Sequence, residues 1–248
     1  MNRKVIFIIL SQMVLIVSVA AVELPEDFSV RFHEPVDLWI NGEINSEALF
    51  DEMNRLDSIL NEDADSWENL YWRSRTAMMR GQIYFDREDS EASIAEIEKS
   101  QRLAKASITI HDNSDSWRIM AEGSSLIMIQ KDFAYIIMNF SKSQDEAKKS
   151  LELDPGNARA SLVIAQFLCN APWIAGGDMK KGIKILEDNS RRTDLIAEDK
   201  FHILLILSEV LQKDKQIEKS IIACTAALEI FPGNQKAQKF LSELKESK

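Results

Sequence analysis

The chain contains few of the residues that interrupt helices. Of its 248 residues only eight are glycine and five are proline. Long runs of β-branched residues, which favour strands, are also scarce. No proline lies between Pro35 and Pro155, so that stretch has no linker typical of a domain boundary. We therefore expect one continuous all-α body that is large enough to bury a substantial core.

Cysteine is nearly absent too. Cys169 and Cys224 are the only two in the chain, and two are too few for the disulfide framework of a small secreted domain. Each lies among apolar residues with helical spacing. We expect both to be small buried side chains.

The motifs of catalytic and metal sites are missing as well. The three histidines, His33, His111 and His202, have no second ligand at metal-site spacing. Nucleophile elbows, phosphate-binding glycine loops and dinucleotide fingerprints are absent, and the acidic pairs fall at helix starts or on solvated faces. These absences predict a non-enzymatic protein without metal or cofactor, in which His111 and His202 are surface or capping residues.

Basic residues are outnumbered. The chain has 40 Asp and Glu against 30 Lys and Arg, a formal net charge of −10. Such a charge disfavours nucleic acid and anionic membrane surfaces as partners, and it favours cationic or neutral ones.

The N-terminus has the pattern of a secretory signal peptide over residues 1–21. A basic start at Arg3 and Lys4 is followed by an apolar stretch and by small residues at 18–20. An uncleaved inner-membrane anchor is the alternative, since the apolar stretch approaches spanning length, although a polar pair interrupts it. In both cases we expect an exported chain, periplasmic or secreted.

One feature that is present is an internal repeat. The octapeptide Ser-Leu-Glu-Leu-Asp-Pro-Gly-Asn at residues 150–157 returns as Ala-Leu-Glu-Ile-Phe-Pro-Gly-Asn at residues 227–234. In both copies proline stops the preceding helix, glycine permits a tight turn and asparagine can cap the next helix. Each octapeptide therefore predicts helix, turn and helix.

A helix face with fixed spacing of large and small residues recurs after 45, 44 and 43 residues, starting at Trp72, Trp117, Ser161 and Leu204. We expect the paired second helices near residues 90–109, 132–152, 178–189 and 214–230. The period exceeds the roughly 34 residues of the common repeat, so the hairpins must be lengthened. The excess falls before Ser143 and before Asp178, and we expect Asp132 and Asp178 to cap helices.

These features divide the chain into three parts. Beyond residues 1–21, residues 22–45 contain Pro25, Pro35 and an Asn-Gly pair, and they predict an irregular lead-in that packs on the first helices. Residues 46–248 predict one domain of about four antiparallel helix hairpins with an amphipathic capping helix at the C-terminus. Close packing within the hairpins is expected at the small residues Ala121, Ala165 and Ser208.

The repeated Pro-Gly-Asn turns and helix faces resemble the tetratricopeptide-repeat (TPR) superfamily over most of residues 46–248. The run at 153–160 and the turn at 172–178 before Lys181 further resemble exported bacterial TPR proteins, such as the periplasmic TPR partner of TRAP-type transporters. The resemblance implies an α-solenoid scaffold whose concave groove binds a protein or peptide without catalysis. It also implies a helper role in a transport or envelope complex, and it is compatible with an oligomeric state.

Applied to the first helix of each hairpin, the resemblance places the following residues in the groove: Arg73, Arg80, Arg118, Glu122, Arg159, Gln166, Asn170 and Glu209. Two interpretations of the four arginines remain open. They form a cationic surface for carboxylates or acidic peptides, or they pair with the surplus of Asp and Glu inside the molecule.

A second function is carriage of a small apolar ligand or lipid in a cavity between the long hairpins. Its lining or lid would come from these residues: Met128, Phe133, Tyr135, Phe167 and Trp173. For Trp173 the sequence favours burial against the next hairpin over a role as a lid, because an aromatic residue in a hairpin loop more often packs than binds.

Overall fold

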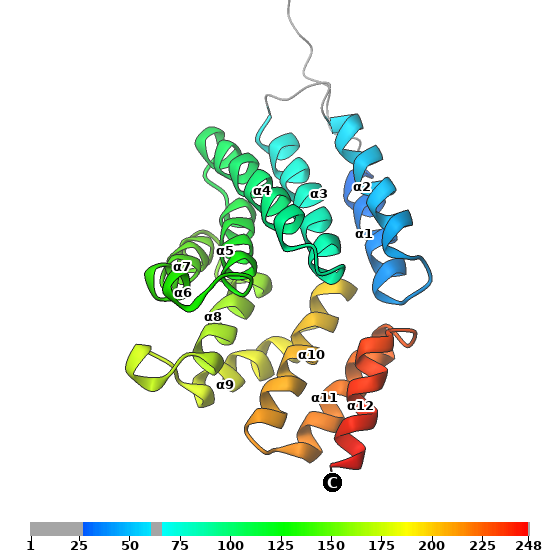
Figure 1. The fold of residues 1–248 in the computed structure, drawn as a ribbon, viewed down its shortest axis with the longest axis vertical. Helices are drawn as coiled ribbons and strands as arrows, with labels where there is room; N and C mark the ends of the chain where they lie inside the picture. The colour runs from blue at the N-terminus through cyan, green and yellow to red at the C-terminus, as the bar shows by residue number, and fades with distance from the viewer. Residues whose placement is uncertain (1–26, 61–65, 248) are drawn as a thin grey trace, which may run out of the picture.

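A computed structural model describes residues 27–60 and 66–247, and throughout that part of the chain the regular structure is helical (Figure 1). The predicted signal peptide at 1–21 lies outside the described residues. The helices are α1 (Phe28–Ile40), α2 (Ser46–Leu60), α3 (Trp67–Asp86), α4 (Ser90–Ile110), α5 (Ser114–Met128), α6 (Phe133–Asn139), α7 (Lys142–Leu153), α8 (Ala158–Asn170), the 3-10 turn η1 (Trp173–Ala175), α9 (Met179–Ser190), α10 (Ala197–Lys213), α11 (Ile217–Ile230) and α12 (Gln235–Glu246).

The predicted hairpin stack is confirmed. Helix α3 pairs with α4, α5 with α7, α8 with α9 and α10 with α11, and α12 packs on α11 as the cap. The predicted second helix near 132–152 is broken into α6 and α7. None of the helices in the described residues is both long enough and apolar enough to cross a lipid bilayer.

Side-chain caps fix where the helices begin. Asn157 and Asn234, the last residues of the two octapeptides, each accept a hydrogen bond from the backbone N–H three positions later. Asp132 and Asp178 cap α6 and α9 in the same way, as the sequence predicts. Each such cap satisfies a backbone donor that the first turn leaves unpaired.

Small residues let the paired helices approach closely. Ser208 on α10 and Ser220 on α11 each donate a hydroxyl hydrogen bond of 2.7 Å to the other's backbone carbonyl. Ala121 and Ala165 are completely buried, as their positions predict. At Gly182 on α9, an added Cβ would lie 2.2 Å from the Sγ of Cys169 on α8. The hairpins therefore have little room for larger side chains at these positions.

The predicted irregular lead-in is wrong for residues 28–40, which form α1 with Pro35 inside it. Four buried side chains recur at helical spacing along α1, and they are Phe28, Phe32, Val36 and Ile40. Proline removes one backbone hydrogen bond from the helix. The four residues bury a continuous apolar stripe, and the free energy gained by this burial exceeds the cost of the lost hydrogen bond, so the helix forms. The expected packing on the first helices is present, because Phe28 and Phe32 both contact the Trp72 ring.

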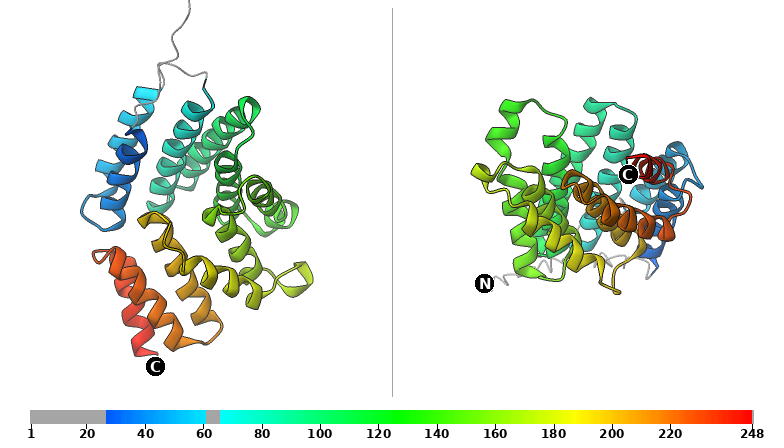
Figure 2. Two further views of the ribbon diagram at one scale, coloured as in Figure 1. Left: turned by 180° about the vertical axis from the view of Figure 1, so that it is seen from behind. Right: turned by 90° about the horizontal axis from the view of Figure 1, so that it is seen from below.

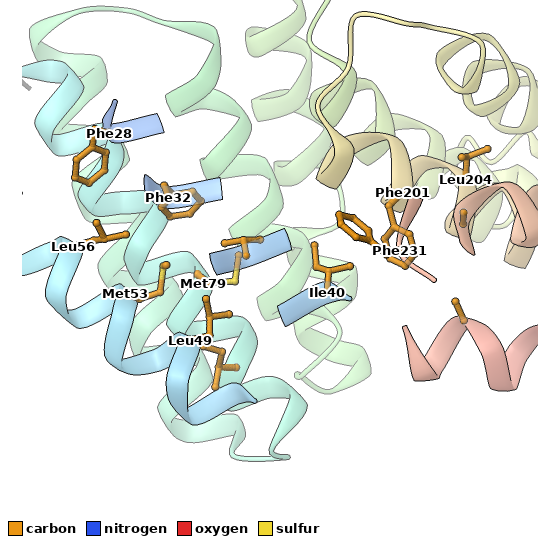
Figure 3. Close-up of a cluster of buried hydrophobic side chains, with 14 of the residues drawn as sticks. Phe28, Phe32, Ile40, Leu49, Met53, Leu56, Met79, Phe201, Leu204 and Phe231 are labelled. Atoms are coloured by element: carbon orange, nitrogen blue, oxygen red, sulfur yellow. The ribbon is translucent and has the colours of Figure 1, made fainter. Parts of the chain in front are cut away.

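The hairpins follow a curved path that brings the α11–α12 hairpin back to the α1–α2 hairpin (Figures 1 and 2). Helix α1 contacts α10, and one apolar core joins α1, α2 and α3 to α10, α11 and α12. In Figure 3, Ile40 lies beside Phe201 and Phe231. Polar contacts secure the junction: Gly233 donates its N–H to Asn41 at 2.7 Å, and the Asn234 amide donates to the Ile40 carbonyl at 2.7 Å. The first helices α3, α5, α8, α10 and α1 thus form a closed circle.

Candidate binding groove

A groove of about 1510 Å³ opens on the inner side of this circle. Its walls come from α5, α6 and α8 on one side and from the α1–α2 turn and the end of α3 on the other. The first half of α10 and the first turn of α12 complete them. Segments far apart in sequence therefore meet at one site because the solenoid closes.

One wall of the groove is apolar. Met128, Phe133, Phe140 and Phe167 line it, and the Phe140 and Phe167 rings stack with centroids 6.3 Å apart. None of the seven residues of α6 is buried, although five of them are large and apolar or aromatic. Phe133 is 75% exposed. Ile137 is 56% exposed as well. Both side chains line the groove and remain available to a partner.

The floor of the groove carries charge that is already neutralised. Glu122 accepts hydrogen bonds from Arg159 at 2.8 Å and from Arg118 at 3.2 Å, and Arg159 also lies 3.8 Å from Asp199. Burial alone would raise the pKa of Glu122, but Arg159 and Arg118 outweigh it and hold the pKa at about 2. Glu122 is therefore ionised at neutral pH and is fully engaged by its two partners.

The pairing continues across the circle of first helices. Glu198 on α10 accepts a hydrogen bond from Arg75 on α3 at 3.3 Å and interacts with His33 on α1 at 3.1 Å. Burial opposes the ionisation of Glu198, but Arg75 and His33 hold its pKa well below the ordinary value. All five first helices contribute to this central ion-pair network, whose members are His33, Arg75, Arg118, Glu122, Arg159, Glu198 and Asp199.

Three of the four arginines placed in the groove from the sequence lie outside its lining. Arg73 pairs with Asp57 of α2 at 3.3 Å, and Arg80, buried, pairs with Asp57 and with Glu96 of α4 at 3.4 and 3.0 Å. Arg118 is buried behind Glu122. Only Arg159 of the four lines the groove, and it is paired. Of the two interpretations, intramolecular pairing describes the structure, because each guanidinium has a carboxylate partner, on its own helix for Arg118 and on neighbouring helices for the other three.

The remaining groove residues divide similarly. Glu122, Gln166 and Asn170 line the groove, and Glu209 lies outside its described lining. The Asn170 side chain accepts a hydrogen bond of 2.7 Å from Lys213. Contact of any of these residues with a partner stays a prediction.

Of the proposed cavity residues, Met128, Phe133 and Phe167 line the groove, whereas Tyr135 packs on the core between α4 and α5. The predicted burial of Trp173 is wrong, since it is 84% exposed, and it does not lie over the groove either. Two features close the turn between α8 and α9. Gly176 adopts a φ of +89°, and the Asp178 N–H donates a hydrogen bond of 2.8 Å to the Leu168 carbonyl. Within this closed turn the Trp173 side chain is left in solvent.

His202 differs from the surface residue that the sequence predicts, because it is half-buried and lines the groove. Burial and the neighbouring Arg159 lower its pKa to about 4, so it is neutral at pH 7. The sequence offered no signal for this, since the position of Arg159 depends on how the hairpins pack.

Among the described residues, the other reactive side chains form no recognisable centre. In the part of the chain that the structure describes, His, Cys, Asp and Glu form no group of three or more that could hold a metal ion. Cys169 and Cys224 are both buried, as predicted, and burial raises the pKa of Cys169 to about 11. Neither thiol is therefore activated.

The fold is similar to that of solved TPR proteins. The crystal structure of TTC0263, a thermophilic TPR protein from Thermus thermophilus, matches with a TM-score of 0.58 and 15% sequence identity over 88% of this chain and 98% of that one. YrrB, a TPR protein described as having an unusual peptide-binding site, matches with a TM-score of 0.39 and 13% identity over 86% and 97% of the two chains. No family model and no curated protein matches the sequence. The first likeness confirms the TPR fold.

Proposed function

We propose that this chain is a non-enzymatic scaffold that binds a segment of a partner protein in the groove. The observation that carries the proposal is that the groove has both an exposed apolar wall and a floor whose charges are already neutralised. A partner that binds there would bury apolar surface and would meet little net charge. A scaffold also agrees with the TPR fold, whose stacked hairpins present extended concave surfaces.

The size of the groove favours a peptide segment. A helix of about 10–12 Å diameter rising 1.5 Å per residue occupies roughly 120–170 Å³ per residue. The groove volume of about 1510 Å³ then accommodates roughly nine to thirteen residues. Pockets for small ligands usually enclose about 300–1,000 Å³, so this open groove is larger than a small ligand needs.

The lining indicates an amphipathic segment. Phe133, Phe140 and Phe167 would contact its apolar face, while the opposite wall presents polar groups, among them Asp86 and Lys236, which pair at 2.8 Å. Because the arginines of the inner circle already have carboxylate partners, an acidic peptide gains no free cation there. We expect recognition through apolar anchors.

We further propose that the chain acts after export, as a helper subunit of a transport or envelope complex. The signal-like pattern of residues 1–21 supports export. A groove without a catalytic centre supports a binding role in such a complex. Cell fractionation with an antibody to residues 66–247 tests the location, and recovery only from the cytoplasm would contradict it.

Loss of apolar anchors from α6 tests groove binding. The double variant Phe133→Ser with Ile137→Ser should lower recovery of the partner from envelope extracts by roughly tenfold or more, since each anchor contributes on the order of 1.5–3 kcal/mol when buried. Ile222→Ser on α11 is the matched control, because Ile222 is similarly exposed but lies outside the groove lining. Equal recovery with both variants would refute binding in the groove.

The aromatic wall also favours a second candidate, a carrier of an apolar ligand or lipid. Native mass spectrometry of the full chain distinguishes the two functions. A co-purifying apolar compound that disappears in the Phe133→Ser, Ile137→Ser variant would support the carrier. Recovery of a stoichiometric protein with no such compound would support the scaffold.

A further inference from the structure

Three large apolar side chains outside the groove are the most exposed of their kind in the described residues. Met138 at the end of α6 is 82% exposed, and Trp173 and Ile174 in η1 are 84% and 80% exposed. None of the three lines the groove. We call these three residues the apolar edge. A folded protein in water gains nothing from presenting tryptophan and isoleucine in this way.

The apolar edge is formed by two separate segments that lie at the same side of the molecule. Helix α6 and the turn η1 both project at one lateral border in Figure 1 and in both views of Figure 2. The Phe140–Phe167 stack holds the end of α6 against α8, and η1 follows α8 directly. Both segments lie where the repeats exceed the common length, so neither is needed to complete a hairpin.

The charge around the apolar edge is opposite to that of the whole chain. Residues 129–142 and 171–184 together contain five lysines and two aspartates, whereas the chain has 40 acidic and 30 basic residues. Lys180 and Lys184 are exposed and lie one turn apart on α9. Lys142 and Lys181 pair with Glu146 and Asp178, so the local positive charge comes from Lys131, Lys180 and Lys184. The negative net charge of the chain disfavours an anionic surface in general, but these three lysines present a local positive charge to it.

We propose that the apolar edge docks on the surface of an anionic lipid bilayer. Tryptophan, isoleucine and methionine enter the boundary between headgroups and acyl chains, and the lysines contact the anionic headgroups. Aromatic residues are enriched at this depth of membranes, where one end of the side chain is apolar and the other is hydrated. The groove, whose lining excludes the apolar edge, remains open to its partner while the protein lies on the bilayer.

Lipid quenching of Trp173 tests the proposal with the full chain. The protein is mixed with vesicles of phosphatidylcholine and phosphatidylglycerol that carry a nitroxide-labelled lipid, and tryptophan fluorescence is compared between wild type and Trp173→Phe. Residues 1–21 are the same in every variant, so any membrane attachment through them cancels in the comparison. We expect a quenched component that Trp173→Phe removes and that is weak on pure phosphatidylcholine.

Matched variants separate the apolar and charged contributions. Met138→Ser with Ile174→Ser should reduce quenching of Trp173, and Ile222→Ser should not. Lys180→Gln with Lys184→Gln should lower the docked-to-free ratio by roughly 25-fold, at about fivefold per lysine near an anionic surface. Lys219→Gln with Lys239→Gln, on α11 and α12, is the control.

Three results would overturn the proposal. Equal quenching of wild type and Trp173→Phe would place Trp173 away from the bilayer, and equal quenching on both lipid compositions would remove the role of the lysines. The third result is self-association without lipid, measured by sedimentation equilibrium, that the Met138→Ser, Ile174→Ser variant abolishes. If this occurs and lipid does not quench Trp173, the apolar edge is an interface between copies of the chain.

Discussion

Replacing Glu122 by glutamine removes the carboxylate that neutralises two buried arginines. The Glu122 side chain is 13% exposed, and its pKa is about 2 against an ordinary 4.5. At 1.36 kcal/mol per pH unit, this difference corresponds to roughly 3 kcal/mol of stability at pH 7. Arg159 keeps Asp199 at 3.8 Å and Arg118 keeps Asp115 at 3.4 Å. We therefore expect Glu122→Gln to cost about 3 kcal/mol, at the lower end of the range for breaking a buried pair.

The pH dependence of this cost gives the prediction its specific form. Because the pKa of Glu122 is lower in the folded chain than in the unfolded chain, its contribution is essentially complete above pH 4.5 and is lost as the pH falls through about 2. At pH 3 the difference in free energy of unfolding between wild type and Glu122→Gln should be roughly 1.4 kcal/mol, about half of its value at pH 7.

Urea denaturation of both proteins at a series of pH values between 3 and 7 measures this difference. Glu152→Gln on α7 is the control, because Glu152 forms an exposed pair with Lys149, and exposed pairs contribute about 0–1 kcal/mol. A cost for Glu122→Gln below about 1 kcal/mol at pH 7, or a cost that does not change with pH, would refute the central ion-pair network as a source of stability.

The other predictions concern helix packing and closure of the circle. Gly182→Ala should destabilise the chain by roughly 1–3 kcal/mol, because the new Cβ would lie 2.2 Å from the Cys169 Sγ; thermal unfolding measures this, and an effect no larger than that of Lys184→Ala on the same helix would contradict it. Asn234→Ala should cost about 2 kcal/mol by removing both the α12 cap and the hydrogen bond to the Ile40 carbonyl. Hydrogen exchange should then be faster in α1, and unchanged exchange there would show that Asn234 does not secure the closure.

The local features of the fold could be predicted from the sequence because they depend on neighbouring residues. Asp132, Asp178 and the two octapeptide asparagines cap helices through backbone groups three positions away. The period of the helix faces likewise indicated which helices pair, and the predicted excess length lies where α6 and η1 occur. These are consequences of helix geometry alone.

The groove could be predicted only in part because its chemistry depends on distant residues. A helix face shows in which direction Arg80 points, but not that Asp57 and Glu96 lie there on two other helices. Helix α1 was missed for a similar reason. Its apolar stripe is readable in the sequence, but Pro35 argued against a helix, and its partner α10 lies more than 150 residues later.

The closure of the circle changes what kind of repeat protein this is. In an open solenoid each repeat touches only its neighbours, so folding can begin anywhere and repeats can be added at either end. Here Asn41 and Gly233, separated by 192 positions, are in direct contact. Contacts of such sequence separation raise the contact order and slow folding. Another hairpin placed between α11 and α12 would separate the residues that join the two ends, so the closure itself limits the number of repeats.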